Sequence, residues 1–146
     1  MSAEIAFTIK DAFDMLQKYT DHTFVFWTYL QVVALTTLGF AWSKETREAS
    51  TLMMLLGFFV VFATLNNVLL VESQAAANTM YDAIVLCLGD QQCSEGLTFD
   101  PFREAMSQDQ PWPASRVRMC HIALSAVVCF ALIPPLVKAW QRKKTG

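Results

Sequence analysis

Three long stretches of this sequence are almost free of charge, and they limit what the chain can fold into. They are residues 24–42, 52–71 and 117–137, in which Arg118 is the only charged residue. Each is close to the ~20 residues that a helix needs to cross a hydrocarbon core about 30 Å thick. A soluble helix would carry a polar face, whereas residues 52–65 are apolar on all sides. The sequence therefore predicts an all-α integral membrane protein with three transmembrane helices.

The overall composition agrees with this class. The 146 residues are 54% hydrophobic and 16% charged, whereas soluble domains are about 45–50% apolar and about 25% charged. The small size and the three-span pattern are typical of bacterial inner-membrane proteins. We therefore expect an inner-membrane location.

The segments between and around the three stretches have their own patterns. Apolar residues recur at helical spacing in the N-terminal segment, and alanines and apolar residues recur every four residues from Ala76 to Leu88. We expect seven segments: an amphipathic interfacial helix (1–21), transmembrane helix 1 (22–42), a cytoplasmic turn (43–51), transmembrane helix 2 (52–71), a partly helical extracytoplasmic segment (72–116), transmembrane helix 3 (117–137) and a basic cytoplasmic tail (138–146).

Charge is distributed unevenly about the predicted spans. Segment 72–116 holds seven acidic residues against Arg103 and Arg116, and the tail holds bases without an acid. Basic residues near membrane ends stay on the cytoplasmic side. We therefore expect the N-terminus outside and the C-terminus in the cytoplasm. The tail bases would contact anionic lipid head groups at about 1 kcal/mol per residue; they are Lys138, Arg142, Lys143 and Lys144.

Polar residues inside the predicted spans are the main candidates for a site. In the predicted topology they all lie at a similar depth, roughly 6–12 Å below the outer boundary. The members are Thr28, Gln31, Asn66, Asn67, His121 and Ser125. An unpaired amide in hydrocarbon costs several kcal/mol, so we expect these groups to bond between helices. The alternative is a small polar cavity open to the outside. Adjacent Asn66 and Asn67 point about 100° apart, which favours self-association or a partner.

Pro134 and Pro135 lie together near the cytoplasmic end of the third span. Two prolines remove two backbone donors and clash with the preceding turn, so they predict a kink or break. This site is either a functional hinge or a simple bend that lets the tail run along the inner surface. The bend is the interpretation we favour.

Motifs for catalysis or cofactor binding are weak. The sequence has no glycine-rich phosphate loop, no GxSxG and no HExxH, so we do not expect an enzyme. His22 and His121 are the only histidines, too few for a convincing haem or copper site. No feature indicates a nucleic-acid partner, and no metal ligand set is predicted.

The function expected from these patterns is that of a non-catalytic membrane subunit or scaffold in a homo- or hetero-oligomeric complex. One alternative is an oligomeric pore or small-molecule carrier that uses the polar layer. A second alternative is a redox or haem-binding membrane protein. The lipid bilayer, further copies of the chain and other membrane subunits are the expected partners.

Four cysteines lead to the first testable prediction. Cys87 and Cys93 fall in the expected outer segment, where an oxidising compartment allows a disulfide, and Cys120 and Cys129 fall within the third span. We predict that unfolded, unreduced protein takes up alkylating reagent at Cys120 and Cys129 alone, as read by intact mass. Cys87 and Cys93 should react only after reduction. Alkylation of all four thiols before reduction would contradict the predicted bridge.

Overall fold

Three long α-helices make up the part of the chain that the computed structural model describes, which is residues 9–43, 48–89 and 111–145. Helix α1 is Ile9–Trp42, α2 is Ala49–Gly89 and α4 is Ala114–Thr145. Each is long and apolar enough to cross a membrane. The described residues therefore confirm the expected all-helical fold with three candidate spans.

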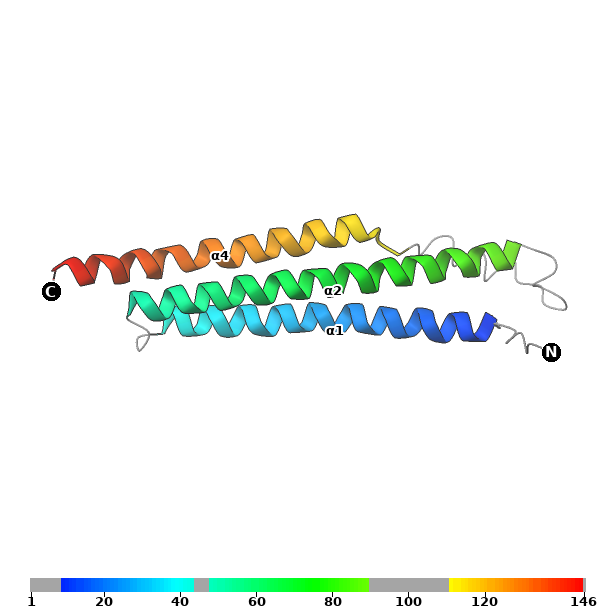
Figure 1. Cartoon of the computed structure of the whole chain (residues 1–146), viewed down its shortest axis with the longest axis horizontal. Helices are drawn as coiled ribbons and strands as arrows, with labels where there is room; N and C mark the ends of the chain where they lie inside the picture. Colours follow the sequence, from blue (N-terminus) through cyan, green and yellow to red (C-terminus); the bar gives the residue numbers. More distant parts are fainter. Residues whose placement is uncertain (1–8, 44–47, 90–110, 146) are drawn as a thin grey trace, which may run out of the picture.

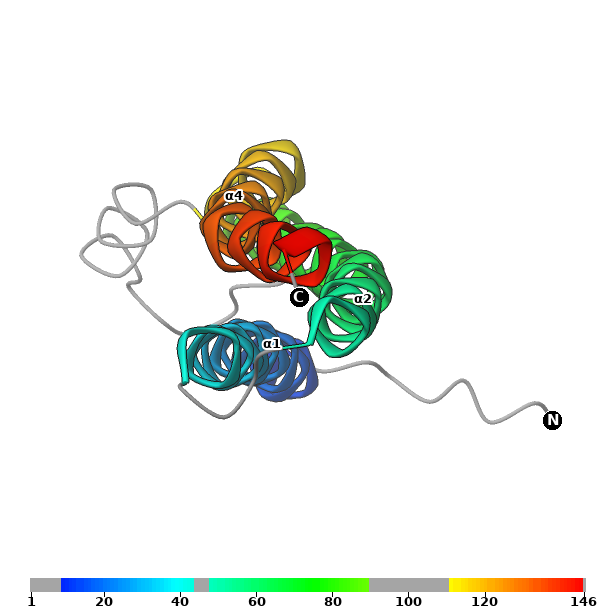
Figure 2. The ribbon, with the colours of Figure 1, turned by 90° about the vertical axis from the view of Figure 1, so that its left-hand side faces the viewer.

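Helix α2 is the centre of an elongated bundle. It runs antiparallel to both α1 and α4, and it lies between them along most of its length (Figure 1). The view along the bundle shows α1 and α4 on two different sides of α2 (Figure 2). Contacts between α1 and α4 are accordingly sparse beside those that each makes with α2. Helix α2 therefore makes most of the contacts that hold the bundle together.

Helix α1 corrects the expected N-terminal arrangement. Residues 9–42 form one unbroken helix, so no separate interfacial helix ends at residue 21. Neither glycine nor proline occurs before Gly39, and the backbone has no reason to turn. The apolar side of the first turns packs on α2, where Ala12, Phe13 and Leu16 surround Ile84. The apolar side of these turns is thus a helix-packing face, and contact of this part of α1 with the membrane surface stays a prediction. Residues 1–8 lie outside the described part.

Helix α2 continues well past the predicted end of its span at residue 71. The four-residue repeat predicts this continuation, and the helix ends at Gly89. The added length is about 27 Å at 1.5 Å per residue. Ala77, Tyr81 and Ile84 are buried along it. The predicted disulfide cannot be placed, because Cys93 and the side chain of Cys87 lie outside the described residues.

Helix α4 runs through Pro134 and Pro135 without a break. Of the kink or break expected there, the break is absent and the kink stays a prediction. Packing on both sides of the proline pair accounts for the unbroken helix. Leu132 before it and Ala139 after it belong to one buried cluster with Ala41 and Leu52. Neighbouring helices allow membrane helices to tolerate proline in this way. A hinge at this position stays a prediction.

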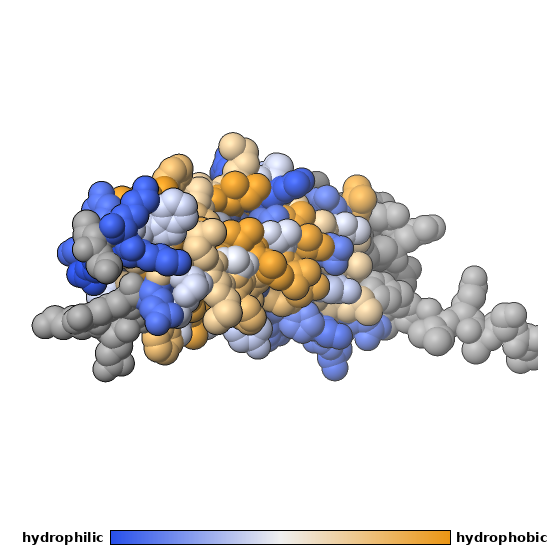
Figure 3. All heavy atoms as spheres, turned by 60° about the vertical axis from the view of Figure 1, so that its left-hand side comes forward, coloured by the Kyte–Doolittle hydropathy of each residue, from blue (hydrophilic) through white to orange (hydrophobic). Residues whose placement is uncertain are grey.

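Large apolar side chains cover the outside of the bundle. Phe24, Leu35 and Phe58 are each more than 70% exposed. Figure 3 shows a broad apolar band between hydrophilic ends on one face of the molecule. Soluble monomers rarely expose contiguous apolar patches beyond a few hundred Å². A surface of this kind is suited to contact with a lipid bilayer.

Phe58 and Phe59 provide a matched test of this packing. Phe59 is 1% exposed within a cluster with Leu30, Ala63 and Val128, whereas Phe58 is 75% exposed. Phe59→Ala should lower the free energy of unfolding by about 3–5 kcal/mol, the range for such changes in packed cores. Phe58→Ala should change it by less than about 0.5 kcal/mol. Reversible unfolding in lipid–detergent micelles measures both, and equal losses would contradict the packing.

Candidate functional site

The side chain of Asn66 connects all three helices. Its Nδ2 atom donates a hydrogen bond to the backbone oxygen of Phe26 on α1 at 3.1 Å. The same atom lies 3.1 Å from Nε2 of His121 on α4. An amide nitrogen carries two N–H donors, and both are used here. Asn66 therefore links its own helix to each of the other two.

His121 is the most enclosed polar group of this site. It is 1% exposed, and Asn66 is 4% exposed. Because Asn66 Nδ2 can only donate, Nε2 of His121 accepts, and the proton of a neutral ring lies on Nδ1. Nδ1 is 3.5 Å from Oγ of Ser125, whose hydroxyl donates to the backbone oxygen of His121 at 2.8 Å. The Trp27 ring lies against the imidazole, with ring centroids 5.9 Å apart.

Two further polar clusters extend from this site toward the start of α1. In the first, Thr23 Oγ1 donates to Ser73 Oγ at 3.3 Å, and Ser73 Oγ donates to the backbone oxygen of Tyr19 at 3.0 Å. In the second, Gln74 and Asn78 both donate to the backbone oxygen of Trp112, at 3.0 and 3.3 Å. Together these bonds tie α2 to α1 and to the segment that precedes α4.

Sequence reasoning missed these two clusters because it ended the second span at residue 71. A signal was present, since Asn66 and Ser73 are seven residues apart and therefore share one face of a helix. Gln74 and Asn78 lie one turn apart, and Gln74 Nε2 donates to Asn78 Oδ1 at 3.0 Å. The polar stripe of α2 thus extends beyond residue 71, where its predicted membrane span ends.

The six polar residues predicted as one layer fall into three different surroundings. Asn66, His121 and Ser125 come together between the helices, as described above. Thr28 and Gln31 are exposed on α1, where the Thr28 hydroxyl donates to the Phe24 carbonyl of its own helix. Asn67 faces a groove between α2 and α4, which His121 and Ser125 also line. The six residues therefore do not line one common surface within a single chain.

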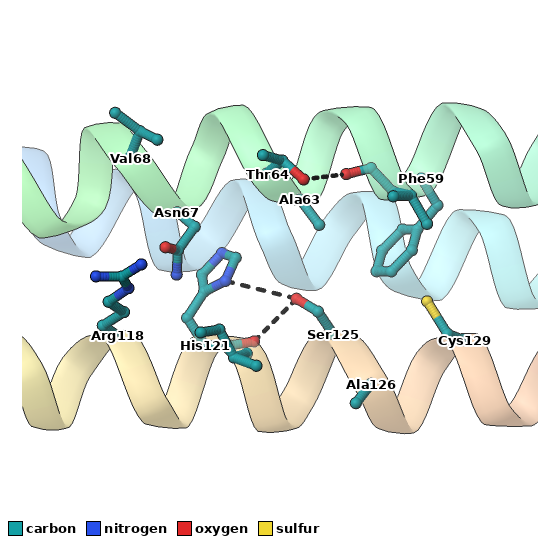
Figure 4. Close-up of a pocket in the computed structure, with 12 residues that line it drawn as sticks. Phe59, Ala63, Thr64, Asn67, Val68, Arg118, His121, Ser125, Ala126 and Cys129 are labelled. Atoms are coloured by element: carbon teal, nitrogen blue, oxygen red, sulfur yellow. Dashed lines mark hydrogen bonds between the residues drawn. The ribbon is translucent and has the colours of Figure 1, made fainter.

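The groove between α2 and α4 encloses about 430 Å³. Asn67, Arg118 and His121 lie toward one end of it, and Phe59 and Cys129 lie toward the other (Figure 4). The Nδ2 atom of Asn67 is buried and has no hydrogen-bond partner among the described residues. A buried donor left unpaired costs about 1–3 kcal/mol, so this atom is a candidate contact for a ligand.

The remaining candidate residues lie apart from this site. His22 is exposed and packs edge-on against Tyr19, with ring centroids 6.4 Å apart. No three His, Cys, Asp or Glu side chains in the described part of the chain are arranged to hold a metal ion. Cys120 and Cys129 are free thiols. The basic side chains of Lys138, Arg142, Lys143 and Lys144 are exposed on the last turns of α4.

Comparison with known proteins adds no relative. The chain matches no protein family, no curated protein and no solved structure. The site is therefore interpreted from its own geometry.

The contact between Asn66 and His121 generates a prediction about stability. Asn66→Leu and His121→Leu each remove the bond between α2 and α4, so their effects should not add. The coupling free energy should be about 0.6–2 kcal/mol, the range for hydrogen bonds between membrane helices. A double-mutant cycle of unfolding in lipid–detergent micelles measures it. As a control, Thr36→Val removes a hydroxyl that bonds only to the Val32 carbonyl of its own helix. Its effect should add to that of His121→Leu, and additivity for the Asn66 pair as well would contradict the contact.

Proposed function

We propose that this protein is a non-catalytic membrane subunit or scaffold, which assembles with a further membrane helix through the face of α1 that carries Gln31. In this proposal the three helices span the bilayer, with the basic end of α4 in the cytoplasm and the N-terminus outside, in a bacterial inner membrane. The complex is formed with further copies of the chain or with other subunits. The exposed amide of Gln31 is the observation that carries the proposal.

Gln31 lies deep within the uncharged part of α1. It is seven residues from Phe24 and eleven from Trp42, which are about 11 Å and about 16 Å along the helix. Its side chain is exposed on the outside of the bundle. At that depth the surroundings are hydrocarbon, which offers no hydrogen bond to an amide. A polar group on a neighbouring helix would satisfy the amide where lipid cannot.

The surface around Gln31 fits a close helix contact. Thr28, Leu35 and Gly39 lie on the same side of α1 by helical spacing, and all three are exposed. Gly39 has open space where a Cβ atom would stand. Small residues let two membrane helices approach closely, and polar side chains then bond across the contact. In a dimer with twofold symmetry, the partner amide would be a second Gln31.

Other features support a scaffold rather than a catalyst. The buried polar side chains Asn66, His121, Ser73 and Gln74 are bonded to one another or to backbone, which is how structural groups are satisfied. These bonds hold the helices in register and leave the outer faces for assembly. Of the six polar residues that the pore or carrier alternative uses, Thr28 and Gln31 lie on the exposed side of α1, away from the groove that Asn67 lines with His121 and Ser125.

Gln31→Leu tests the proposed contact. The loss of one interhelical hydrogen bond, worth about 0.6–2 kcal/mol, should weaken assembly by roughly threefold to thirtyfold. Native mass spectrometry of protein released gently from its own membrane reports the fraction in complexes. Wild-type protein should form a defined assembly, and Gln31→Leu should shift it toward single chains.

Gln17→Leu is the matched control, because it makes the same chemical change at another exposed position of α1, outside the uncharged stretch. It should leave the assembled fraction unchanged. The proposal would be contradicted if the wild-type protein stayed monomeric in the membrane. It would also be contradicted if Gln31→Leu did not weaken the assembly.

A further inference from the structure

We infer that the groove between α2 and α4 is a binding site for an anionic phospholipid. The phosphate group would lie at Arg118 and Asn67, and one acyl chain would lie along the apolar part of the groove. This inference rests on the bilayer insertion proposed above, but it does not depend on assembly through Gln31, which lies on a different helix.

The polar end of the groove offers two unused donors. Asn67 Nδ2 is buried and has no partner within residues 9–43, 48–89 and 111–145, and Figure 4 shows its side chain pointing toward α4 beside Arg118. Arg118 is exposed, and no acidic side chain in the described ranges pairs with it. An amide N–H and a guanidinium both donate to phosphate oxygens, and such charge-assisted bonds are about twice as strong as neutral ones. His121 and Ser125, in contrast, already use their protons within the site.

The rest of the groove is suited to an acyl chain. Beyond the polar end it is lined mainly by apolar side chains, among them Phe59, Ala63 and Ala126. From Arg118 to Cys129 it runs eleven residues along α4, which is roughly 16 Å. Its volume of about 430 Å³ falls within the range of about 300–1,000 Å³ found for small-molecule sites.

The direction of the groove matches the direction of a lipid in a bilayer. Arg118 stands at the edge of the charge-free stretch of α4, since residues 119–137 carry no charge. Arginine at such an edge places its guanidinium in the interface, at the level of the phosphate groups. The apolar end of the groove then points toward the membrane centre. One anionic lipid would thus satisfy the charge at Arg118, the donor at Asn67 and the apolar walls.

Lipid retention in native mass spectrometry tests the inference. The protein is placed in mixed vesicles of phosphatidylglycerol and phosphatidylcholine, extracted gently, and examined for bound lipid. Wild-type protein should retain one phosphatidylglycerol in preference to phosphatidylcholine. Arg118→Gln should reduce that retention about tenfold, as expected for the loss of a charge-assisted hydrogen bond. Equal retention of the two lipids by wild-type protein would overturn the inference.

Arg116→Gln is the matched control, because Arg116 lies two residues away with its guanidinium over the Trp112 ring, 5.8 Å from the ring centroid. The Arg116→Gln protein should retain phosphatidylglycerol like the wild type. An equal loss of lipid in the Arg116→Gln and Arg118→Gln proteins would indicate nonspecific charge attraction and would contradict a binding site in the groove. Ala126→Phe fills the apolar part of the groove and should also abolish retention.

Two further measurements distinguish a lipid in the groove from a free phosphate and from a lipid at the subunit contact. Glycerol 3-phosphate, which has the head-group phosphate without acyl chains, should not displace the lipid. Displacement would contradict binding of an acyl chain in the apolar part of the groove. Gln31→Leu should retain phosphatidylglycerol even where it dissociates the assembly. Loss of lipid in the Gln31→Leu protein would place the lipid at the subunit contact and refute its binding in the groove. Retention of the lipid would show that lipid binding does not depend on the contact at Gln31.

Discussion

The hydrogen bonds of one amide nitrogen hold the three helices in a defined arrangement. Asn66 Nδ2 reaches the Phe26 carbonyl and the His121 ring, each at 3.1 Å. Inside a bilayer no water replaces a lost partner, so a shift of any helix leaves at least one of these groups unpaired. The apolar clusters near Leu30 and Ala41 add stability to this arrangement, but their attraction is not directional. The amide therefore sets the register in which those clusters pack.

The polar groups of the bundle differ in how completely the single chain satisfies them. Asn66 Nδ2 uses both of its donors between the helices. Asn67 has a buried donor without a partner among the described residues, and Gln31 is exposed among apolar residues. In a soluble protein, water could form hydrogen bonds with the amides of Asn67 and Gln31. A membrane protein requires another molecule, and the two proposals assign a lipid to Asn67 and a helix to Gln31. Both follow from the same cost of an unpaired amide in hydrocarbon.

Much of the fold could be predicted, because charge-free length and four-residue repeats are local properties. The three helices and the continuation of α2 to Gly89 followed from them. The errors arose where tertiary contacts decide. The first turns of α1 have a face that suits either a membrane surface or another helix, and only contact with Ile84 shows which. At Pro134 and Pro135, local chemistry predicted a kink or a break, and packing on both sides keeps α4 continuous.

By itself, the sequence determined that the chain forms three membrane-length helices, since hydrophobicity summed over about 20 residues needs no knowledge of neighbours. It also identified the polar residues that such helices cannot leave unpaired. Only the tertiary structure decided which of them meet. Adjacent residues such as Asn66 and Asn67 point about 100° apart on any α-helix. The rotation of α2 about its axis decides that Asn66 enters the bundle and that Asn67 faces a groove. That rotation is set by long-range packing against other helices, which no local pattern encodes.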